Sequence, residues 1–187
     1  MSDQDHRTII GQYPYIRYDD PEAIVRPWDP RGPAVADRLI GLIGAAFPEG
    51  TVEHIGSTAI PGCDGKGVID LMLLYRPGRL AAARDAVDGL GFQRHEAPGA
   101  HPDERPVRIG TIDHDGETFR VHVHILAGDA TEVVRQRHFR DTLRSDPELV
   151  AAYVADKRRI AAGGGVGDGT AYAEAKAQFI GAVNETR

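Results

Sequence analysis

Two short apolar segments, joined through a Gly-Ser-Thr turn, constrain the fold of this chain more than any other feature. Thr51–Ile55 and Val68–Tyr75 have the length and apolar content of β-strands, and the turn at 56–58 directly follows the first. Glycine lets a backbone approach a ligand closely, and the N–H groups of such a turn hold phosphate oxygens. Asp70 puts a lone carboxylate inside the second strand, which is costly unless the carboxylate is paired or bound to a metal. The region predicts a nucleotide site at a sheet edge, although Gly-Ser-Thr is also a common turn and Asp70 can instead cap a loop or pair with an arginine.

A second strand pattern carries the other candidate groups. Residues 113–116 read Asp-His-Asp-Gly between two extended segments, which predicts a β-hairpin. In the strand that follows, alternation separates an apolar face from a face with one arginine and two imidazoles. The apolar face holds Val121, Val123 and Ile125, and the other face holds Arg120, His122 and His124.

The remaining segments carry the apolar spacing of helices. The helical ranges are 33–47, 79–90, 131–144, 147–162 and 170–185, with a short strand expected over 92–95. We therefore expect an α+β fold, a small mixed β-sheet covered by helices, with a C-terminal helical segment. The expected organisation is a flexible leader over residues 1–12 and a single domain over 13–187. Within that domain, residues 13–127 form the α/β core and 128–187 the C-terminal helices.

Composition excludes several classes of protein. The chain has 187 residues, of which 41% are hydrophobic, enough for one domain with a sizeable core. Its formal net charge of −6 argues against a nucleic-acid partner, because such proteins carry a basic excess. The chain has one cysteine, no membrane-length apolar run and no apolar signal-peptide core, which together favour a cytoplasmic protein. We further expect a bacterial protein that is a monomer or a homodimer.

Several motifs taken together resemble the GrpB family, a branch of the nucleotidyltransferase superfamily. The resemblance covers most of the chain and implies the nucleotidyltransferase type of sheet. The motifs are Trp28-Asp29-Pro30, the segment 53–62 with Lys66 and Ile69-Asp70, His122-Val123-His124, Phe139-Arg140-Asp141 with Leu143-Arg144, and the pairs Tyr153/Lys157 and Tyr172/Lys176.

Nucleotidyl transfer requires bound phosphates, a bridging divalent cation and an aligned acceptor oxygen. The resemblance puts Gly56 and Ser57, with the neighbouring Thr58, at the phosphate-holding turn and Asp70 at the metal. Lys66, in the loop between the strands, would neutralise phosphate charge, unless it is a solvated loop residue.

The chain departs from the superfamily pattern at Met72, where a second carboxylate is usual. A thioether does not replace a carboxylate for Mg²⁺, which prefers oxygen ligands. Three interpretations of His122 and His124 remain open. They bind one metal, Mn²⁺ or Zn²⁺, together with Asp70; they act as acid and base or contact phosphate directly; or they belong to a site that still binds its ligand but no longer catalyses a reaction. His54 is a further site candidate, but it alternates with Glu53, so only one of the two shares the site face.

Basic and aromatic groups recur on the C-terminal helices. Arginines at 137, 140 and 144 share one helical face, and each Tyr/Lys pair is spaced i, i+4. Such spacing also suits an ordinary surface. Turned toward the core, these groups would hold a triphosphate tail or stack a base, and the candidates are Arg140, Lys157, Tyr172 and Lys176.

Two functions follow as hypotheses. The first is a nucleotidyltransferase-like enzyme that binds ATP or another nucleoside triphosphate with Mg²⁺ or Mn²⁺. It would transfer a nucleotidyl group to a small polar acceptor, or activate that acceptor with ATP as a transferase or ligase does. The alternative is a non-catalytic module that binds nucleotides or coenzyme A precursors through a degenerate metal site, since relatives of this domain occur fused to dephospho-coenzyme A kinase. A third possibility is an enzyme of another class that uses the histidine pair as acid and base.

Overall fold

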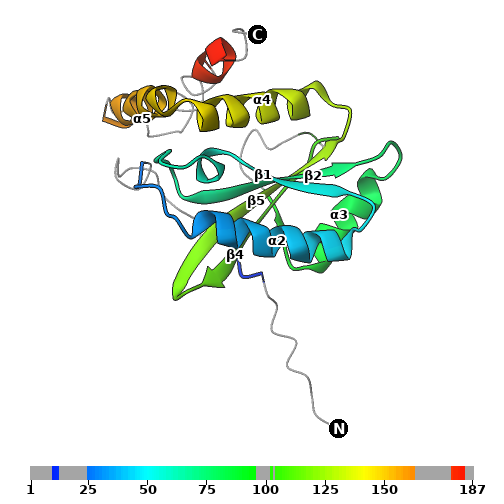
Figure 1. The fold of residues 1–187 in the computed structure, drawn as a ribbon. Helices are drawn as coiled ribbons and strands as arrows, with labels where there is room; N and C mark the ends of the chain where they lie inside the picture. Colours follow the sequence, from blue (N-terminus) through cyan, green and yellow to red (C-terminus); the bar gives the residue numbers. More distant parts are fainter. Residues whose placement is uncertain (1–9, 13–24, 96–101, 103, 163–177, 184–187) are drawn as a thin grey trace.

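A five-stranded sheet lies between two layers of helices in the computed structural model of the chain (Figure 1). The structure describes residues 10–12, 25–95, 102, 104–162 and 178–183. Its elements are α2 (Gly32–Ala46), β1 (Thr51–Ile55), the 3₁₀ turn η1 (Ser57–Ala59), β2 (Val68–Tyr75), α3 (Leu80–Gly89), β3 (Gln93–Arg94), β4 (Val107–His114), β5 (Glu117–Ala127), α4 (Thr131–Ser145) and α5 (Pro147–Ala162).

The strand order is β1-β2-β5-β4-β3, and the sheet is mixed. β2 and β5 pair in parallel, whereas the other neighbouring strands are antiparallel. The predicted α+β class and mixed sheet are therefore confirmed. The parallel pair matters most for function, because it sets the strand carrying Asp70 directly beside the strand carrying the two histidines.

One face of the sheet packs against α2 and α3 (Figure 1). The odd-numbered residues of β2 and β5 point into this layer, as the alternation of β5 predicts. They form one buried cluster with the inward faces of both helices: Ile69, Leu71, Leu73, Val121, Val123 and Ile125 with Val35, Leu39, Ile43, Ala83 and Val87. The other side of each strand is thus available for polar groups.

The C-terminal helices α4 and α5 lie over the opposite side of the sheet (Figure 1). α4 contributes Val133 to a small buried cluster with Met72 and Ile55 on the strands. Phe139 of α4 and Tyr153 of α5 lie in a second cluster, which includes Ile60 of the loop after η1. These contacts fix the C-terminal helices next to the Gly-Ser-Thr turn.

The hairpin between β4 and β5 closes through the two residues Asp115 and Gly116. Both have positive φ, 48° and 78°, as a two-residue type I′ turn requires, so the Asp-Gly signal is confirmed. The turn fixes the register of β5 and with it the faces of His122 and His124.

The expected leader of residues 1–12 ends earlier than the sequence predicts. Ile10 is only 3% exposed, and Gly11 pairs with Thr111 at the edge of β4, so these residues belong to the folded core. Residues 1–9 lie outside the described part. At the other end, residues 178–183 are helical, and the rest of the helix expected over 170–185 also lies outside it. Within the described residues, no helix has both the length and the apolar character needed to cross a bilayer.

Candidate functional site

The Gly-Ser-Thr turn lies directly against the Asp70 carboxylate. Gly56 has φ +72° and ψ −173°, a conformation that residues with a side chain rarely adopt. A Cβ at this position would lie 2.5 Å from Oδ2 of Asp70 and 3.0 Å from its Cβ. Glycine is therefore required both by the backbone conformation and by the space that the carboxylate occupies.

Asp70, His122 and His124 converge on one point above the parallel strands. The register pairs Asp70 with His122 and Met72 with His124, so all four side chains share one face of the sheet. Oδ1 of Asp70 lies 3.5 Å from Nδ1 of His122 and 3.6 Å from Nε2 of His124. The three possible ligand atoms lie within 4.8 Å of one another.

These separations suit a bound cation. Two ligand atoms at about 2.0–2.2 Å from a common metal lie roughly 3–4 Å apart, depending on the angle between them. The three side chains are 22–24% exposed, which leaves an approach from solvent. Two imidazoles and one carboxylate also form a ligand set that transition metals accept more readily than Mg²⁺ does.

The histidine at 122 is held in the form that binds metals. Burial lowers its pKa to about 4, and the nearby Asp70 charge opposes this shift only in part. Its imidazole is therefore neutral at pH 7, as a metal ligand must be. His95 lies beside it, with ring centroids 6.0 Å apart. No local pattern predicts His95 as a neighbour of the site, because it follows the short edge strand β3, which lies two strands away from β5 in the sheet.

Met72 occupies the position where a second carboxylate is usual, and the structure shows that this position is closed. Its side chain is 0% exposed and packs with Ile55 and with Val133 of α4. A carboxylate at that point would be buried among apolar groups. The apolar side chain of Met72 therefore fits the apolar surface that α4 places against this position.

Lys157 of α5 reaches the turn from the opposite layer. It is only 1% exposed, and its Nζ lies 3.3 Å from Oγ of Ser57 and 3.4 Å from Sγ of Cys63. The ammonium also donates to the carbonyl oxygen of Asp64 and lies 4.4 Å from the centre of the Tyr153 ring. The structure therefore brings two predicted phosphate-binding residues, Lys157 and Ser57, into contact.

The arginines of α4 bind strand β1 and the turn. Arg137 and Arg140 both pair with Glu53, and the pKa of that carboxyl is lowered chiefly by the hydrogen bonds from Arg137. Arg140 also donates to the carbonyl oxygen of His54 at 3.1 Å, and Arg144 donates to that of Ala59 at 2.7 Å. These contacts tie the helix to the sheet, and the phosphate contact expected of Arg140 stays a prediction.

His54 faces the side of the sheet opposite to Asp70, because β1 pairs it with Leu71. Its Nε2 lies 2.9 Å from Oγ1 of Thr58, and that hydroxyl donates its one proton to the carbonyl oxygen of Val68 at 3.0 Å. The imidazole must therefore be the donor to Thr58, which fixes its tautomer. Both predicted residues act here on the shape of the turn, and a direct role in chemistry stays a prediction for each.

The three remaining predicted site residues are Lys66, Tyr172 and Lys176. Lys66 is half-buried, and its carbonyl oxygen accepts a hydrogen bond from Arg120. Tyr172 and Lys176 lie outside the described residues.

The fold and the site together define a class of protein. It is an α+β protein in which a glycine turn contacts a carboxylate on one strand, and two histidines lie beside that carboxylate on the neighbouring parallel strand. The family described as GrpB protein matches this chain over residues 22–186. The chain belongs to the GrpB family.

Individual relatives agree with this assignment. A UPF0157 protein of Pseudomonas aeruginosa is 35% identical over 150 residues, which cover 76% of this chain and 59% of the relative. A dephospho-CoA kinase of Mycolicibacterium paratuberculosis is 33% identical over 161 residues, covering 71% of this chain and 38% of the kinase. The crystal structure of GrpB from Enterococcus faecalis has a TM-score of 0.68 at 23% identity, covering 87% of this chain and 96% of that one. The chain thus spans under two thirds of the length of these two curated relatives.

Proposed function

We propose that the protein binds a nucleoside triphosphate with a divalent cation and transfers a nucleotidyl group to a small polar acceptor. The observation that carries this proposal is the convergence of Asp70, His122 and His124 beside the Gly-Ser-Thr turn. The family resemblance supports it, because the same residues match the superfamily's phosphate turn and metal-binding strand.

The residues of the chain supply three of the functions that phosphoryl chemistry needs. The first N–H groups of a helical turn have no acceptor within that turn, so those of η1 would donate to phosphate oxygens. Lys157 adds a buried positive charge next to Ser57. Asp70, His122 and His124 would hold the cation, which when bound would neutralise charge on the phosphate oxygens.

The ligand set favours Mn²⁺ over Mg²⁺ as the cation. Mg²⁺ prefers an octahedron of oxygen atoms, whereas this site offers two imidazole nitrogens and one carboxylate. Mn²⁺ takes carboxylate ligands and has a higher affinity for mixed sites than Mg²⁺. The closed position of Met72 leaves the chain with a single carboxylate on β2 at this site, and one cation rather than two suits that arrangement.

A binding module without turnover is the second candidate. Met72 is the specific observation that favours it, since catalysis by two cations requires the carboxylate that this residue replaces. The relative named as a dephospho-CoA kinase supports an accessory role close to nucleotide chemistry. In this case the turn and Lys157 would bind phosphates, and Asp70 would not be needed.

Nucleotide binding, measured by calorimetry with and without Mn²⁺ or Mg²⁺, tests these two candidates. The variants are Asp70→Asn, which keeps the side-chain shape, Lys157→Met, and Asp85→Asn as a control on the exposed face of α3. The proposal expects Mn²⁺-dependent binding of one triphosphate, lost in Asp70→Asn, weakened in Lys157→Met and kept in Asp85→Asn, with pyrophosphate release once the acceptor is supplied. Binding that ignores both the cation and Asp70 selects the binding module, and no binding of any nucleotide refutes both.

A further inference from the structure

A third histidine, His95, lies beside the cation cluster of Asp70, His122 and His124, and the proposed function does not use it. It follows directly after the edge strand β3, whereas His122 lies on β5, two strands away. Neighbouring strands are about 4.8 Å apart, so the backbones of β3 and β5 are separated by roughly 10 Å. The ring centroids of His95 and His122 are nevertheless only 6.0 Å apart. The side chain of His95 therefore leans across β4 toward the cluster.

The register of the strands explains this position. β3 pairs Arg94 with Arg108 of β4, so the next residue, His95, stands level with Val107. β4 pairs Val107 with His124 of β5. Residues directly opposite each other in a sheet point to the same face. The register therefore puts His95 on the face of the sheet that carries the cation cluster.

His122 has nearly the same geometric relation to His95 as to His124. The centroids are 6.0 Å apart and the ring planes 64° apart in the first pair, against 6.5 Å and 65° in the second. Two imidazoles that bind one cation through nitrogens about 2.0–2.1 Å away have centroids roughly 4.5–6.4 Å apart. The pair with His95 falls within this range, and the pair with His124 lies just beyond it. His95 is thus as well placed toward His122 as the histidine that the cluster already contains.

With His95, the ligand set comprises three imidazoles and one carboxylate. Imidazole suits transition metals, whereas Mg²⁺ prefers oxygen ligands throughout. Four protein ligands leave two positions of a six-coordinate cation such as Mn²⁺ for phosphate oxygens. An imidazole that binds a metal through one nitrogen donates a hydrogen bond through the other, so further contacts of these rings are compatible with metal binding.

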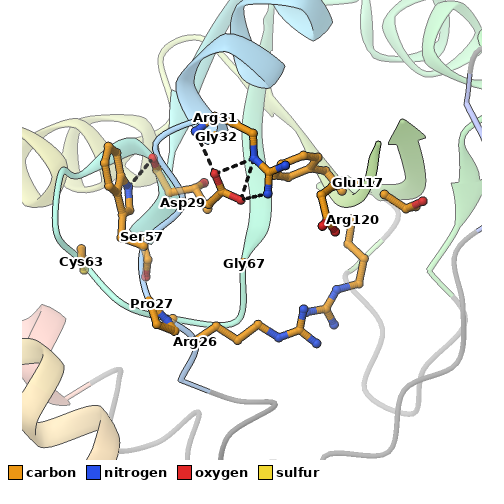
Figure 2. A pocket seen from close by; sticks show the side chains of 15 residues that line it. Arg26, Pro27, Asp29, Arg31, Gly32, Ser57, Cys63, Gly67, Glu117 and Arg120 are labelled. Carbon is orange, nitrogen blue, oxygen red and sulfur yellow. Dashed lines mark hydrogen bonds and ion pairs between the residues drawn. The ribbon is translucent and has the colours of Figure 1, made fainter. Parts of the chain in front are cut away.

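The cavity that borders the Gly-Ser-Thr turn does not offer a second centre of this kind. It has a volume of about 120 Å³ and lies between the turn, the segment before α2 and the beginning of β5 (Figure 2). Among the described residues that line it, the carboxylates are Asp29 and Glu117, and there is no histidine. Asp29 accepts hydrogen bonds from Nε and Nη2 of Arg31, at 3.0 and 2.7 Å. Binding of a transition metal is therefore expected at the cluster and not in the cavity.

We propose that His95 is a further ligand of the cation held by the cluster, which makes the centre one of three histidines and one aspartate that prefers transition metals to Mg²⁺. The part that this cation plays in nucleotide chemistry rests on the proposed function. The centre itself rests on the register of the strands, the ring geometry and the chemistry of the ligand set.

Titration of the protein with Mn²⁺, without nucleotide, tests whether His95 binds the cation. Free Mn²⁺ is measured by electron paramagnetic resonance, and a parallel series contains Mg²⁺ as a competitor. The variants are His95→Gln, which keeps a polar side chain without the imidazole, and His124→Gln, which removes a ligand of the cluster. His114→Gln is the matched control, because His114 lies at the other end of β4, beside the hairpin turn. Thermal melting without metal checks that each variant is folded.

We expect one Mn²⁺ to bind per chain. The dissociation constant should rise roughly tenfold or more in His95→Gln and in His124→Gln, since even the neighbours of metal ligands contribute this much, and should not change in His114→Gln. Equal Mn²⁺ affinity in His95→Gln and wild type overturns the assignment of His95 as a ligand. Competition by Mg²⁺ at a concentration equal to that of Mn²⁺ overturns the preference for transition metals.

The variant His95→Cys separates direct binding from a structural role of the residue. A thiolate is a metal ligand, and a thiolate bound to Co²⁺ gives an intense sulfur-to-metal absorption band that imidazole and carboxylate ligands do not give. We expect this band when Co²⁺ is added to His95→Cys and not when it is added to the wild type, whose one cysteine, Cys63, is buried. Weaker Mn²⁺ binding in His95→Gln without the band in His95→Cys would assign the residue a structural role and overturn the proposal.

These titrations contain no nucleotide, so their outcome is distinguishable from that of the nucleotide experiment. Mn²⁺ binding that depends on His95, together with no binding of any nucleotide, supports the centre and refutes the proposed function. Mn²⁺-dependent nucleotide binding that is as tight in His95→Gln as in the wild type supports the proposed function and overturns this inference.

Discussion

Replacing Gly56 by alanine tests how closely the turn and the carboxylate are fitted to each other. The new Cβ would lie 2.5 Å from Oδ2 of Asp70, closer than Cβ atoms approach other atoms, in a backbone conformation with φ +72°. Either the turn or Asp70 has to move. The variant therefore perturbs the candidate site without removing any of its polar groups.

The expected cost has two parts. A residue with a side chain in this backbone region costs about 1–3 kcal/mol. The contact with Asp70 adds about 1–3 kcal/mol, as overpacking of a close-packed site does. Gly62→Ala is the control, because Gly62 has φ +73° and an added Cβ meets nothing within 4 Å. It should cost only about 1–2 kcal/mol, for the left-handed backbone alone.

These costs are measured by urea denaturation of four variants: Gly56→Ala, Gly62→Ala, Asp70→Ala and the double variant Gly56→Ala/Asp70→Ala. The double variant removes the closest contact, so the effects at 56 and 70 should be non-additive by about 1–2 kcal/mol, with the pair more stable than the sum predicts. Mn²⁺ affinity of Gly56→Ala should fall together with its stability. The reasoning is refuted by a Gly56→Ala variant that loses no more free energy of unfolding than Gly62→Ala, or by additivity with Asp70→Ala.

Two other predictions concern buried groups near the site. Met72→Asp should lower the free energy of unfolding by roughly 3 kcal/mol or more, because it buries a carboxylate among apolar side chains. The control Met72→Leu should lower it by less than about 1.5 kcal/mol. A stable Met72→Asp variant that binds Mg²⁺ more tightly than the wild type would show that the position is open. Burial lowers the pKa of His54 to about 4. Between pH 6.5 and 4 the unfolded chain therefore binds more protons at this residue than the folded chain does. The free energy of unfolding should fall as the pH drops through this window. The loss attributable to this residue is at most about 3 kcal/mol, and chemical denaturation at pH 7, 5.5 and 4 should show a smaller decrease in His54→Gln than in wild type.

Much of the fold follows from local patterns. The alternation in β5 and the Asp-Gly turn define both the strand and its faces, and the apolar run at Val68–Tyr75 defines β2. The pairing of these two strands is not local, because β2 and β5 are separated in the chain by α3, β3 and β4. Periodicity predicts that a strand exists and which way its side chains point, but it does not name the neighbouring strand.

For the candidate site, too, local patterns predict the individual groups but not the contacts between distant segments. The sequence identifies Asp70, the two histidines and Lys157 as unusual groups, and the structure brings them to one side of the sheet. Spacing on a helix gives a shared face but not a partner, so it did not reveal that Arg140 binds Glu53.

The parallel pairing of β2 with β5 has a kinetic consequence. Asp70 lies on β2 and both histidines lie on β5, so the cluster forms only when these two strands pair. Parallel pairing across an intervening helix and hairpin is a slow, non-local step in folding. A cation that binds only the completed cluster therefore acts after this step: it slows unfolding and leaves the early folding rate unchanged. Removal of such a cation would then shorten the lifetime of the folded protein more than it would delay folding.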